Sequence, residues 1–407
     1  MRRISQYAFL FVLVISGCNQ SADSVAIQSN DSTSQLKEIF QHLADNNDSI
    51  LAKADILLSI EPVPITHFSA ERSSGGIHDF YSEGDYWWPD PDNPEGPYIR
   101  KDGMTNPNNF LEHRKAIRNL NEWVTTLVAA FDISKDQRYS THALKHLTAF
   151  FLDENTHMNP TLLYAQAIKG RHTGRGIGII DTIHLIELVK AIQKLIEHNK
   201  ISPEIETGLK RWFEEYTTWM NNHPYGLKEK NHGNNHSTWW AAQVAAFASL
   251  TGREDHMNIA RSQFKRLISN QMQADGGFTD ELNRTKPYIY TLFHLEGYAI
   301  LCELASSKQE NLWTYEGKNG SIRKAWDFMM PFIKDKSAWN YPPDVQNFDQ
   351  VPIQTVGHLL AAIAYDDPEY ISIWKNLNPL KKSEEIKRNF PLWQPHLWLT
   401  NTKKLEK

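Results

Sequence analysis

The sequence predicts an all-α protein whose helices form a single large domain, an (α/α) toroid, which is an incomplete barrel of antiparallel helix pairs. Apolar residues recur at helical spacing through most of the 407 residues, and strand-like alternation of apolar and polar residues is nearly absent. The connections are mostly short, such as SPE at 202–204 and TGRED at 251–255. Antiparallel pairs over so long a chain indicate a solenoid or a toroid, and the lack of a sequence period argues against ordinary short helical repeats.

Residues 1–17 are predicted to be a signal peptide of the lipoprotein type. Arg2 and Arg3 precede the apolar run AFLFVLVI, and small residues follow it before Cys18. The run is shorter than the roughly 20 apolar residues that a membrane-spanning helix needs. Because ISGC resembles the bacterial lipoprotein processing site, Cys18 is the predicted lipidation site. The alternative is an ordinary signal peptide with an incidental cysteine.

Residues 18–33 are small and polar, which is typical of a flexible tether, and residues 34–400 are expected to form the toroid. The sequence therefore predicts an exported protein of the periplasm or the outer membrane, attached to the membrane through a lipid on Cys18.

Cysteine content and net charge exclude some classes of protein. Cys302 is the only cysteine besides Cys18, so no intrachain disulfide is available and stability must come from the core. The formal net charge is −5, and it is two units more negative without Arg2 and Arg3. A general nucleic-acid binder would carry a basic face, so no nucleic-acid partner is expected. A polyanionic ligand held by a few local cations remains compatible with this charge.

Helical spacing is clearest at 203–220, where Pro203 suits the first turn. One stripe of that predicted helix contains Ile205, Leu209, Trp212, Phe213, Tyr216 and Trp219. The predicted helices lie near 34–58, 115–132, 137–152, 181–197, 203–220, 237–250, 254–272, 289–306, 321–333 and 355–365. In a toroid, functional residues lie on the loops at one end of the ring and on the tips of inner helices. The non-helical segments are therefore the candidates for a functional site.

The first of these segments, residues 81–109, contains many prolines and glycines that prevent regular structure. It also contains the aromatic residues Tyr86, Trp87, Trp88 and Tyr98. Long aromatic loops commonly act as lids or binding walls, and aromatic faces pack well against sugar rings. The alternative is an irregular segment that closes one end of the core.

The second segment, residues 159–181, is rich in glycine and arginine ahead of a helix expected to begin near Asp181. Its glycines and basic residues are Gly170, Arg171, His172, Gly174, Arg175, Gly176 and Gly178. The spacing is not that of a phosphate-binding GxxxxGK[ST] loop. Arginines beside Tyr164 and Gln166 are better suited to bind a carboxylate. Alternatively, each arginine caps a neighbouring helix.

The third segment, NHGNNHSTWW at 231–240, places Asn234, Asn235 and His236 at or just before the N-terminus of an apolar helix. Backbone N–H groups there favour a carboxylate, and an asparagine amide can donate to it as well. His232 and His236 are four residues apart, as some metal ligands are, but HExxH and nearby cysteines are missing. The alternative role is helix capping. The two tryptophans are expected to lie in the core.

The fourth segment, residues 274–298, places Arg284 and Lys286 near Tyr288 and Tyr290, ahead of another helix. A neighbouring arginine stabilises a phenolate, so a tyrosine here can act first as base and then as acid. This spacing is weak by itself, because arginine–tyrosine neighbours are common.

Amide, imidazole, arginine and tyrosine together indicate β-elimination from a uronic acid. Removal of the C5 proton beside a carboxylate creates a dianionic intermediate, which requires donors to the carboxylate, a base and an acid. Glycoside hydrolysis would require two carboxylates instead. Asp275, Asp280 and Glu281 are candidates for that pair, but they leave the asparagines and histidines unexplained.

Four motifs in this order resemble the alginate lyase family of (α/α)-toroid polysaccharide lyases. The motifs are YWWPDPDNPEGPY with DGMTNPN, YAQAIKGRHTGRGIGIID, NNHSTWW and ELNRTKPYIYTLF. The resemblance covers most of residues 80–300. It implies a polysaccharide lyase that cleaves alginate, with mannuronate-rich alginate favoured, or glucuronan. The implied reaction is a metal-independent β-elimination that leaves 4,5-unsaturated uronate ends and uses no cofactor.

The resemblance also implies roles for individual residues. Asn235 would neutralise the substrate carboxylate, and His236 would share that role or act as base. Arg284 would stabilise the carboxylate and the tyrosinate. Tyr290 would be base and acid, with Tyr288 in reserve because helical spacing alone pairs it with Arg284. The aromatic loop would be a lid, and the substrate-binding residues would be Tyr86, Trp88, Tyr164, Gln166 and Arg171.

Two other functions remain open from the sequence. One is a glycoside hydrolase on a similar toroid, and the other is a non-catalytic glycan-binding lipoprotein. The expected partner is an anionic polysaccharide, alginate or a related uronan.

Overall fold

The structure is a computed structural model that describes residues 35–379 and 383–399. The predicted signal peptide, Cys18 and the tether lie outside the described residues. Within the described ranges the chain is mostly helical, which confirms the all-α class, and residues 35–44 form its first helix. The other α-helices are α2 (Asn47–Leu57), α3 (Glu112–Ser134), α4 (Gln137–Phe151), α5 (Leu185–Glu197), α6 (Pro203–Asn222), α7 (Pro224–Lys230), α8 (Asn235–Thr251), α9 (Glu254–Gln271), α10 (Thr279–Leu282), α11 (Pro287–Ala305), α12 (Ile322–Lys334), α13 (Val356–Tyr365), α14 (Pro368–Asn376) and α15 (Glu384–Asn389).

Short strands and 3-10 helices fill some of the connections. Strand β1 (Tyr81–Glu83) pairs in parallel with β4 (Tyr164–Ala167), and β2 (Trp87–Trp88) pairs antiparallel with β3 (Ile99–Arg100). The 3-10 helices are η1 (Ile65–His67), η2 (Gly176–Thr182), η3 (Leu312–Thr314), η4 (Lys336–Ala338), η5 (Phe348–Gln350) and η6 (Pro395–Leu397).

Each predicted helical stretch contains a helix, and most ends agree within a few residues. The stretch near 34–58 holds two helices with a turn between them. Helix α5 begins at Leu185 rather than near Asp181, because η2 occupies the preceding residues. The short helices α7, α10, α14 and α15 were not predicted, since fewer than three turns show little periodicity.

Helix α6 illustrates how the sequence produces these elements. The Ser202 side chain caps the helix by accepting from Ile205 N, and Pro203 occupies the first turn. The stripe expected to face the core does so: Leu209, Trp212, Phe213 and Tyr216 are buried, and Ile205 and Trp219 are partly buried against the core.

Helices α8 and α11 are buried on nearly all sides and pack against each other at the centre of the molecule. Trp239 and Trp240 have no exposed surface, as the sequence predicted. The Trp239 ring stacks on Phe293 of α11 at 4.8 Å between ring centroids. A Cβ atom at Gly297 would lie 3.1 Å from the Trp239 indole, so glycine there permits the close approach of the two helices.

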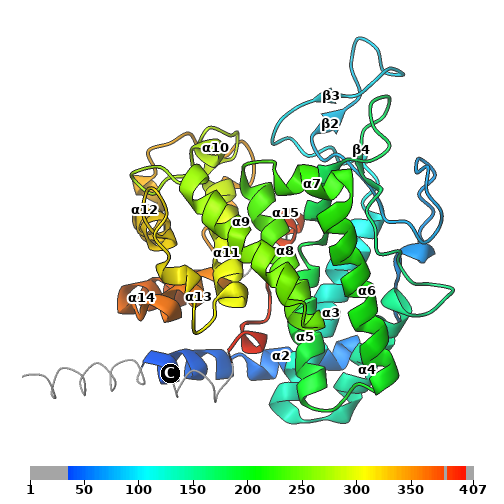
Figure 1. Ribbon diagram of the computed structural model, residues 1–407, viewed down its shortest axis with the longest axis horizontal. Helices are drawn as coiled ribbons and strands as arrows, with labels where there is room; N and C mark the ends of the chain where they lie inside the picture. Colours follow the sequence, from blue (N-terminus) through cyan, green and yellow to red (C-terminus); the bar gives the residue numbers. More distant parts are fainter. Residues whose placement is uncertain (1–34, 380–382, 400–407) are drawn as a thin grey trace, which may run out of the picture.

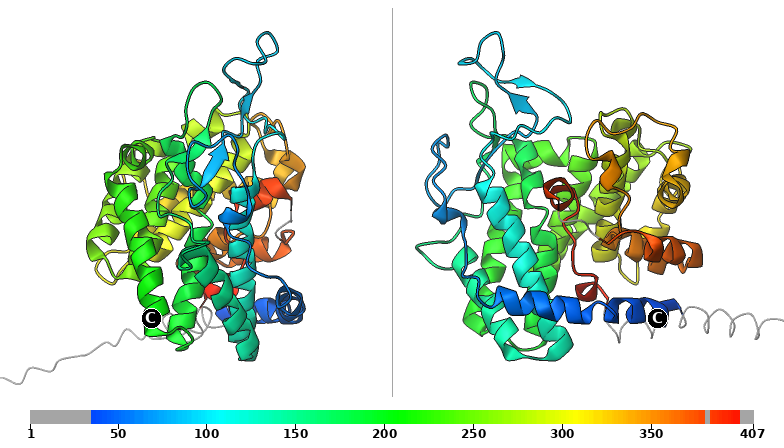
Figure 2. Two further views of the ribbon diagram at one scale, coloured as in Figure 1. Left: turned by 90° about the vertical axis from the view of Figure 1, so that its right-hand side faces the viewer. Right: turned by 180° about the vertical axis from the view of Figure 1, so that it is seen from behind.

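The connections that carry chemistry gather at one end of the molecule. Figure 1 shows β2, β3 and β4 at the same end as α7 and α10, and α2 runs across the opposite end. The views in Figure 2 show the same arrangement and place α15 between the two groups of helices. The loops therefore surround the end of the helical array, where a toroid carries its functional residues. No helix in the described ranges combines the length and the apolar character needed to cross a membrane.

The C-terminal segment is held in this array by the buried carboxylate of Glu187 on α5. Its oxygens accept hydrogen bonds from the backbone N–H groups of Trp393 and Gln394 at 2.8–2.9 Å. The indole of Trp398 donates to the same carboxylate at 3.2 Å. Because this segment continues from α15, Glu187 also fixes the position of α15.

Replacing Glu187 by alanine should lower the free energy of unfolding by about 3 kcal/mol, because buried N–H donors lose their acceptor. Urea unfolding followed by circular dichroism measures this change. The control is Glu197→Ala on the same helix, which removes an exposed partner of Lys194 and should change stability by less than about 0.5 kcal/mol. Equal effects of the two substitutions would contradict this assignment.

Candidate active site

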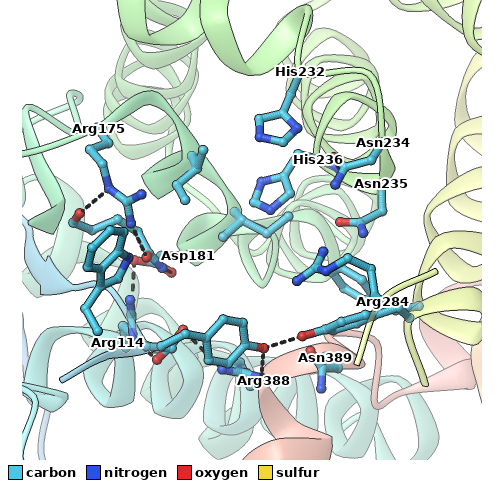
Figure 3. A pocket seen from close by; sticks show the side chains of 18 of the residues that line it. Arg114, Arg175, Asp181, His232, Asn234, Asn235, His236, Arg284, Arg388 and Asn389 are labelled. Atoms are coloured by element: carbon cyan, nitrogen blue, oxygen red, sulfur yellow. Dashed lines mark hydrogen bonds and ion pairs between the residues drawn. The ribbon is translucent and has the colours of Figure 1, made fainter. Parts of the chain in front are cut away.

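A pocket of about 360 Å³ lies at the end of the molecule that carries β2, β3 and β4 (Figure 3). Its lining comes from parts of the chain that are far apart in sequence. These parts are the loop 84–109, helix α3, the stretch from β4 to η2, the region of α7 and the start of α8, the segment 284–293, and α15. The pocket therefore exists only in the folded chain.

The start of α8 forms one wall. Asn234 is the N-cap, and its side chain accepts a hydrogen bond from His236 N at 3.1 Å. Asn235 is the first helical residue, as the sequence predicted, and it lines the pocket. Its backbone N and its Nδ2 contact the two carboxyl oxygens of Glu281 at 2.9 and 2.7 Å. The Asn235 side chain is therefore fixed from behind, and its free end is available to a ligand.

His236 is oriented by a buried carboxylate. Its Nδ1 lies 2.6 Å from Glu229 Oε1, and Glu229 has no exposed surface. This contact leaves Nε2 as the ring nitrogen available to a ligand. The ring of His232 stacks on His236 at 4.9 Å. Burial and then the electrostatic effect of His236 lower the pKa of His232, which favours the neutral form of its ring.

Arg284 connects the loop 84–109 to the opposite wall. Its guanidinium binds both carboxyl oxygens of Asp102, at 3.2 and 3.0 Å. Thr285 donates to the same carboxylate at 2.9 Å. The guanidinium also lies 4.5 Å from the centre of the Tyr290 ring. Arg284 therefore places its charge over the face of the Tyr290 ring while the loop holds it in place.

The Tyr290 hydroxyl lies in a network of polar groups although the side chain is buried. It is 2.5 Å from the hydroxyl of Tyr86, to which Arg388 Nη2 donates at 3.1 Å. Burial and then Tyr86 raise the pKa of Tyr290 well above its ordinary value, while the charges of Arg284 and Arg388 oppose that rise. The phenol is therefore protonated at rest, and the two arginines stabilise the ionised form when it appears.

The wall across the pocket is built from ion pairs. Arg114 contacts Asp85 at 2.5 Å and Asp181 at 3.0 Å, and Arg388 contacts Asp85 at 3.1 Å. Burial alone would raise the pKa of Asp85, but Arg114 and Arg388 lower it below its ordinary value. Gln166 donates to Asp181 at 3.1 Å. Both carboxylates are already paired with arginines, so they are poor candidates for general acids.

The pocket brings together most of the residues that the sequence predicted. The predicted residues that line it are Asn235, His236, Arg284, Tyr290, Tyr86 and Gln166. Tyr288 lies elsewhere: it is fully buried, and its hydroxyl donates to Phe332 O at 2.9 Å. Of the two tyrosines, only Tyr290 reaches the pocket.

Three predicted substrate-binding residues do not line this pocket. The Trp88 indole donates to Met104 O at 2.8 Å. The guanidinium of Arg171 is exposed and donates to Tyr98 O at 2.7 Å. The ring of Tyr164 packs so closely on Gly75 that a Cβ there would lie 2.5 Å away. Their role in binding substrate stays a prediction.

Several pocket residues have no role in the predictions made from the sequence. They are Asp85, Arg100, Arg114, Arg118, Asp181, His184, Lys228, Arg388 and Asn389. Trp87 and Arg175 also line the pocket, and they lie in the predicted aromatic and glycine-rich segments. Arg114 and Arg118 are four residues apart on α3, and both are buried. Two buried arginines on one helix face would have been a usable signal, because arginine is rarely buried unless it is paired.

The carboxylates proposed for a hydrolase do not form a pair across the pocket. Asp275 and Asp280 are exposed and do not line it. Glu281 is fully buried behind Asn235. Among the described residues, no group of three or more histidine, cysteine or acidic side chains is placed to hold a metal ion.

Comparisons with known proteins support the fold and identify the family. The family model for alginate lyase matches residues 65–339. The crystal structure of an alginate lyase from Bacteroides ovatus is 30% identical, with a TM-score of 0.76, and the alignment covers 90% of this chain and 96% of that one. Alginate lyase A1-III from Sphingomonas species A1 shares the fold at 12% identity, with a TM-score of 0.52 over 80% of this chain and 89% of that one.

An alginate lyase from Pseudomonas syringae pv. syringae is 26% identical over 197 residues, which is 46% of this chain and 50% of that protein. The chain thus spans about half the length of the curated relatives it matches. The family model nevertheless matches more than half of the chain, and the Bacteroides structure aligns with nearly all of it. The predicted (α/α) toroid is confirmed by these structural neighbours, and the chain belongs to the alginate lyase family.

Proposed function

We propose that this chain is a polysaccharide lyase that cleaves alginate or a related polyuronate by β-elimination. Its membership of the alginate lyase family supports this proposal. The observation that carries it is the presence of the Tyr290 hydroxyl, the Arg284 guanidinium and the Asn235–His236 pair in one pocket. Elimination beside a carboxylate requires donors to that carboxylate and a group that takes and returns a proton.

In this proposal, the substrate carboxylate binds between Asn235, His236 and Arg284. The N-terminus of α8 adds the partial positive charge of its backbone N–H groups. Negative charge on the carboxylate grows as the C5 proton leaves, so these donors act most strongly in the transition state. Substrate competes with Asp102 for the Arg284 guanidinium, which the loop carboxylate occupies in the free protein.

Tyr290 transfers the proton. Its ionised form takes the proton from C5, and the electron pair of the C–H bond becomes the C4–C5 double bond while the C4–O bond breaks. The leaving oxygen then receives the proton from the Tyr290 phenol. One product carries an unsaturated uronate and the other a free hydroxyl, and no water is consumed. Arg284 and Arg388 stabilise the tyrosinate that this cycle needs.

We also propose that the reaction needs no metal and that mannuronate-rich alginate or glucuronan is preferred. The support for the first point is that Arg284 can supply a positive charge at the carboxylate, and Asn235, His236 and the start of α8 can supply hydrogen-bond donors. A variant of alginate lyase A1-III, which is 12% identical with a TM-score of 0.57, was crystallised with a tetrasaccharide. That complex is consistent with a saccharide of several rings in the corresponding pocket.

A panel of polymannuronate, polyguluronate, glucuronan and a neutral glucan tests the function. Cleavage by elimination gives a double bond conjugated with a carboxylate, whose ultraviolet absorbance rises with time, and chromatography gives the product sizes. Excess EDTA should leave the rate unchanged. Folded protein that gives no unsaturated product from any of the uronans would refute the proposal.

We propose further that the chain is exported and anchored through a lipid on Cys18, in the periplasm or at the outer membrane. The support is the sequence of residues 1–18, with its basic start, short apolar run and ISGC site. Labelled palmitate should be incorporated by the wild-type chain in cells and not by Cys18→Ala. Equal labelling of both would rule out this anchor.

A further inference from the structure

We propose that Arg175 forms a second carboxylate site in the pocket, which binds the uronate next to the one that reacts, so that the protein selects polymers in which neighbouring rings are both charged. This inference rests on the proposed lyase function and names the class of substrate for it.

The pocket has receptors for anions on two facing walls. Figure 3 shows Arg175 and Arg114 on one side and His232, His236 and Asn235 on the other, with open space between them. In the proposed reaction, the wall with Asn235 and His236 binds the carboxylate of the reacting ring. A polymer that crosses the pocket must therefore place another ring beside Arg175.

Arg175 has no carboxylate partner among the residues that the structure describes, unlike Arg114 and Arg388. Its Nε donates to the backbone oxygen of Gln166 at 2.8 Å, and its Nη2 lies 3.3 Å from Gln166 Oε1. The nearby carboxylate of Asp181 is taken by Arg114 at 3.0 Å. The charge of Arg175 therefore remains available to a ligand.

The energetic state of Arg175 fits a binding role. Burial lowers the pKa of Arg175 to about 10, against the opposing charge of Asp181. The side chain thus keeps its positive charge at neutral pH although it has lost much of its hydration. A partly buried charge without a direct ion pair destabilises the free protein, and an incoming carboxylate reduces that penalty.

The site is also built in advance. Gln166, which supplies both acceptors to Arg175, has a φ of 54°, a left-handed conformation that is uncommon for a residue other than glycine. The guanidinium lies 5.8 Å from the centre of the Trp87 ring, which limits its movement. Lys228 of α7 lines the same pocket and adds positive charge. It packs close to Gly176, where an added Cβ would lie 3.3 Å from the Lys228 Cβ. A fixed, planar guanidinium suits bidentate binding of a carboxylate.

The chemistry of the substrate decides what this second site can recognise. In a homopolymer of uronates, every ring carries a carboxylate, so both receptors are filled at once. In a polymer with a neutral sugar at every second ring, Arg175 faces a neutral ring when the reacting carboxylate is bound. The site therefore favours uronate homopolymers such as alginate and glucuronan over alternating copolymers.

The test compares KM and kcat on polymannuronate and on the same polymer after partial chemical reduction of its carboxylates. Arg175→Gln should raise KM on polymannuronate by about tenfold or more and keep kcat within about threefold, because it removes one charge-assisted pair. On the reduced polymer the two proteins should be nearly equal. Arg175→Lys, which keeps the charge without the fork, should be intermediate.

Two further arginine substitutions identify the residue responsible. Arg211→Gln removes an exposed charge from α6, away from the pocket, and controls for net charge. Arg171→Gln tests the neighbouring arginine, which also lies over Trp87 but does not line the pocket. An unchanged KM for Arg175→Gln, a loss confined to kcat, or the larger KM effect in Arg171→Gln would each overturn the inference.

Binding measurements separate this inference from the proposed function. Calorimetry with saturated tetramannuronate should show weaker binding to Arg175→Gln than to the parent protein, measured in a Tyr290→Phe background that prevents turnover. Equal affinities overturn the second site even when the wild type is an active lyase. A protein that binds tetramannuronate through Arg175 but releases no unsaturated product would keep the site and lose the lyase assignment.

Discussion

Tyr290→Phe should lower kcat on a uronan by about 10³-fold or more, because the hydroxyl is the group that takes the C5 proton and returns it to the leaving oxygen. KM should change little, since the aromatic ring and the Arg284 contact above it remain. The lost hydroxyl is 2.5 Å from Tyr86, so thermal unfolding must be measured to show that the fold is intact. Initial rates of ultraviolet absorbance give kcat and KM.

The adjacent tyrosine provides a matched control. Tyr288→Phe removes one buried hydrogen bond to Phe332 O and should reduce stability by about 1 kcal/mol. It should leave kcat unchanged, because its hydroxyl lies outside the pocket. If Tyr288→Phe abolished turnover and Tyr290→Phe did not, the acid–base group would have been assigned to the wrong tyrosine.

The same assignment fixes the direction of the pH dependence. Burial raises the pKa of Tyr290 well above its ordinary value, so only a small fraction is ionised at neutral pH. Below the pKa, each increase of one pH unit raises the ionised fraction about tenfold. kcat should therefore rise with pH up to the limit of stability, as the folded enzyme gains tyrosinate. A kcat that falls between neutral and alkaline pH, with folded protein, would contradict Tyr290 as the base.

The sequence predicted the α8 wall well because its chemistry is local. Asn234, Asn235 and His236 are adjacent at the start of a helix, and the N-terminus of a helix is where backbone N–H groups are free. The family resemblance selects Tyr290 as the acid–base group, since helical spacing alone favours Tyr288. Pro287 begins α11, so Arg284 lies before the helix and four-residue pairing does not apply.

Strand geometry explains why only one of the two adjacent tryptophans faces the pocket, a choice that the sequence alone could not make. Trp87 and Trp88 are successive residues of β2, and successive side chains of a strand point to opposite faces. The tertiary arrangement decides which of the two faces the pocket, and it is Trp87. In the glycine-rich segment, Arg175 lines the pocket and Arg171 does not. The sequence cannot distinguish them, because the segment has no helical periodicity that would predict where each side chain points.

Residues that reach the pocket from distant parts of the sequence could not be predicted. Arg388 lies on α15, a six-residue helix without a periodic pattern, and it meets Asp85 only because the C-terminal segment folds back across the toroid. The burial of Glu229 and Glu281 could likewise not be predicted, because in the sequence both resemble surface residues of short helices. Their contacts with His236 and Asn235 depend on the packing of separate helices.

The protonation of Glu281 leads to a second large effect. Burial raises the pKa of its carboxyl, and the two donors of Asn235 and the charges of Arg284 and His236 oppose that rise only in part. Its neighbour His294 lies 3.6 Å away, but burial lowers the pKa of His294 to about 3, so this ring carries no charge at neutral pH. Burial is the largest of these effects, so we expect the Glu281 carboxyl to be a neutral acid.

A neutral Glu281 determines which end of the Asn235 amide faces the substrate. One carboxyl oxygen accepts from Asn235 N at 2.9 Å, and the other accepts from Asn235 Nδ2 at 2.7 Å, which leaves the amide oxygen facing the pocket when Glu281 is ionised. The two ends of an amide have the same shape, so a protonated acid can donate to the amide oxygen and turn the NH2 group into the pocket. An NH2 group is the end that can bind a uronate carboxylate, whereas the oxygen would repel it.

Glutamine has the same donor and acceptor pattern as the neutral acid, so Glu281→Gln should keep kcat/KM within about tenfold. Glu281→Ala frees the Asn235 amide and should reduce kcat/KM by about 10² to 10³-fold, the usual effect of losing a preorganised donor. If Glu281 were instead ionised, or were a hydrolytic carboxylate, Gln would be as damaging as Ala. Measuring kcat/KM for both variants, with thermal unfolding to correct for stability, therefore decides whether Asn235 meets the substrate through its NH2 group.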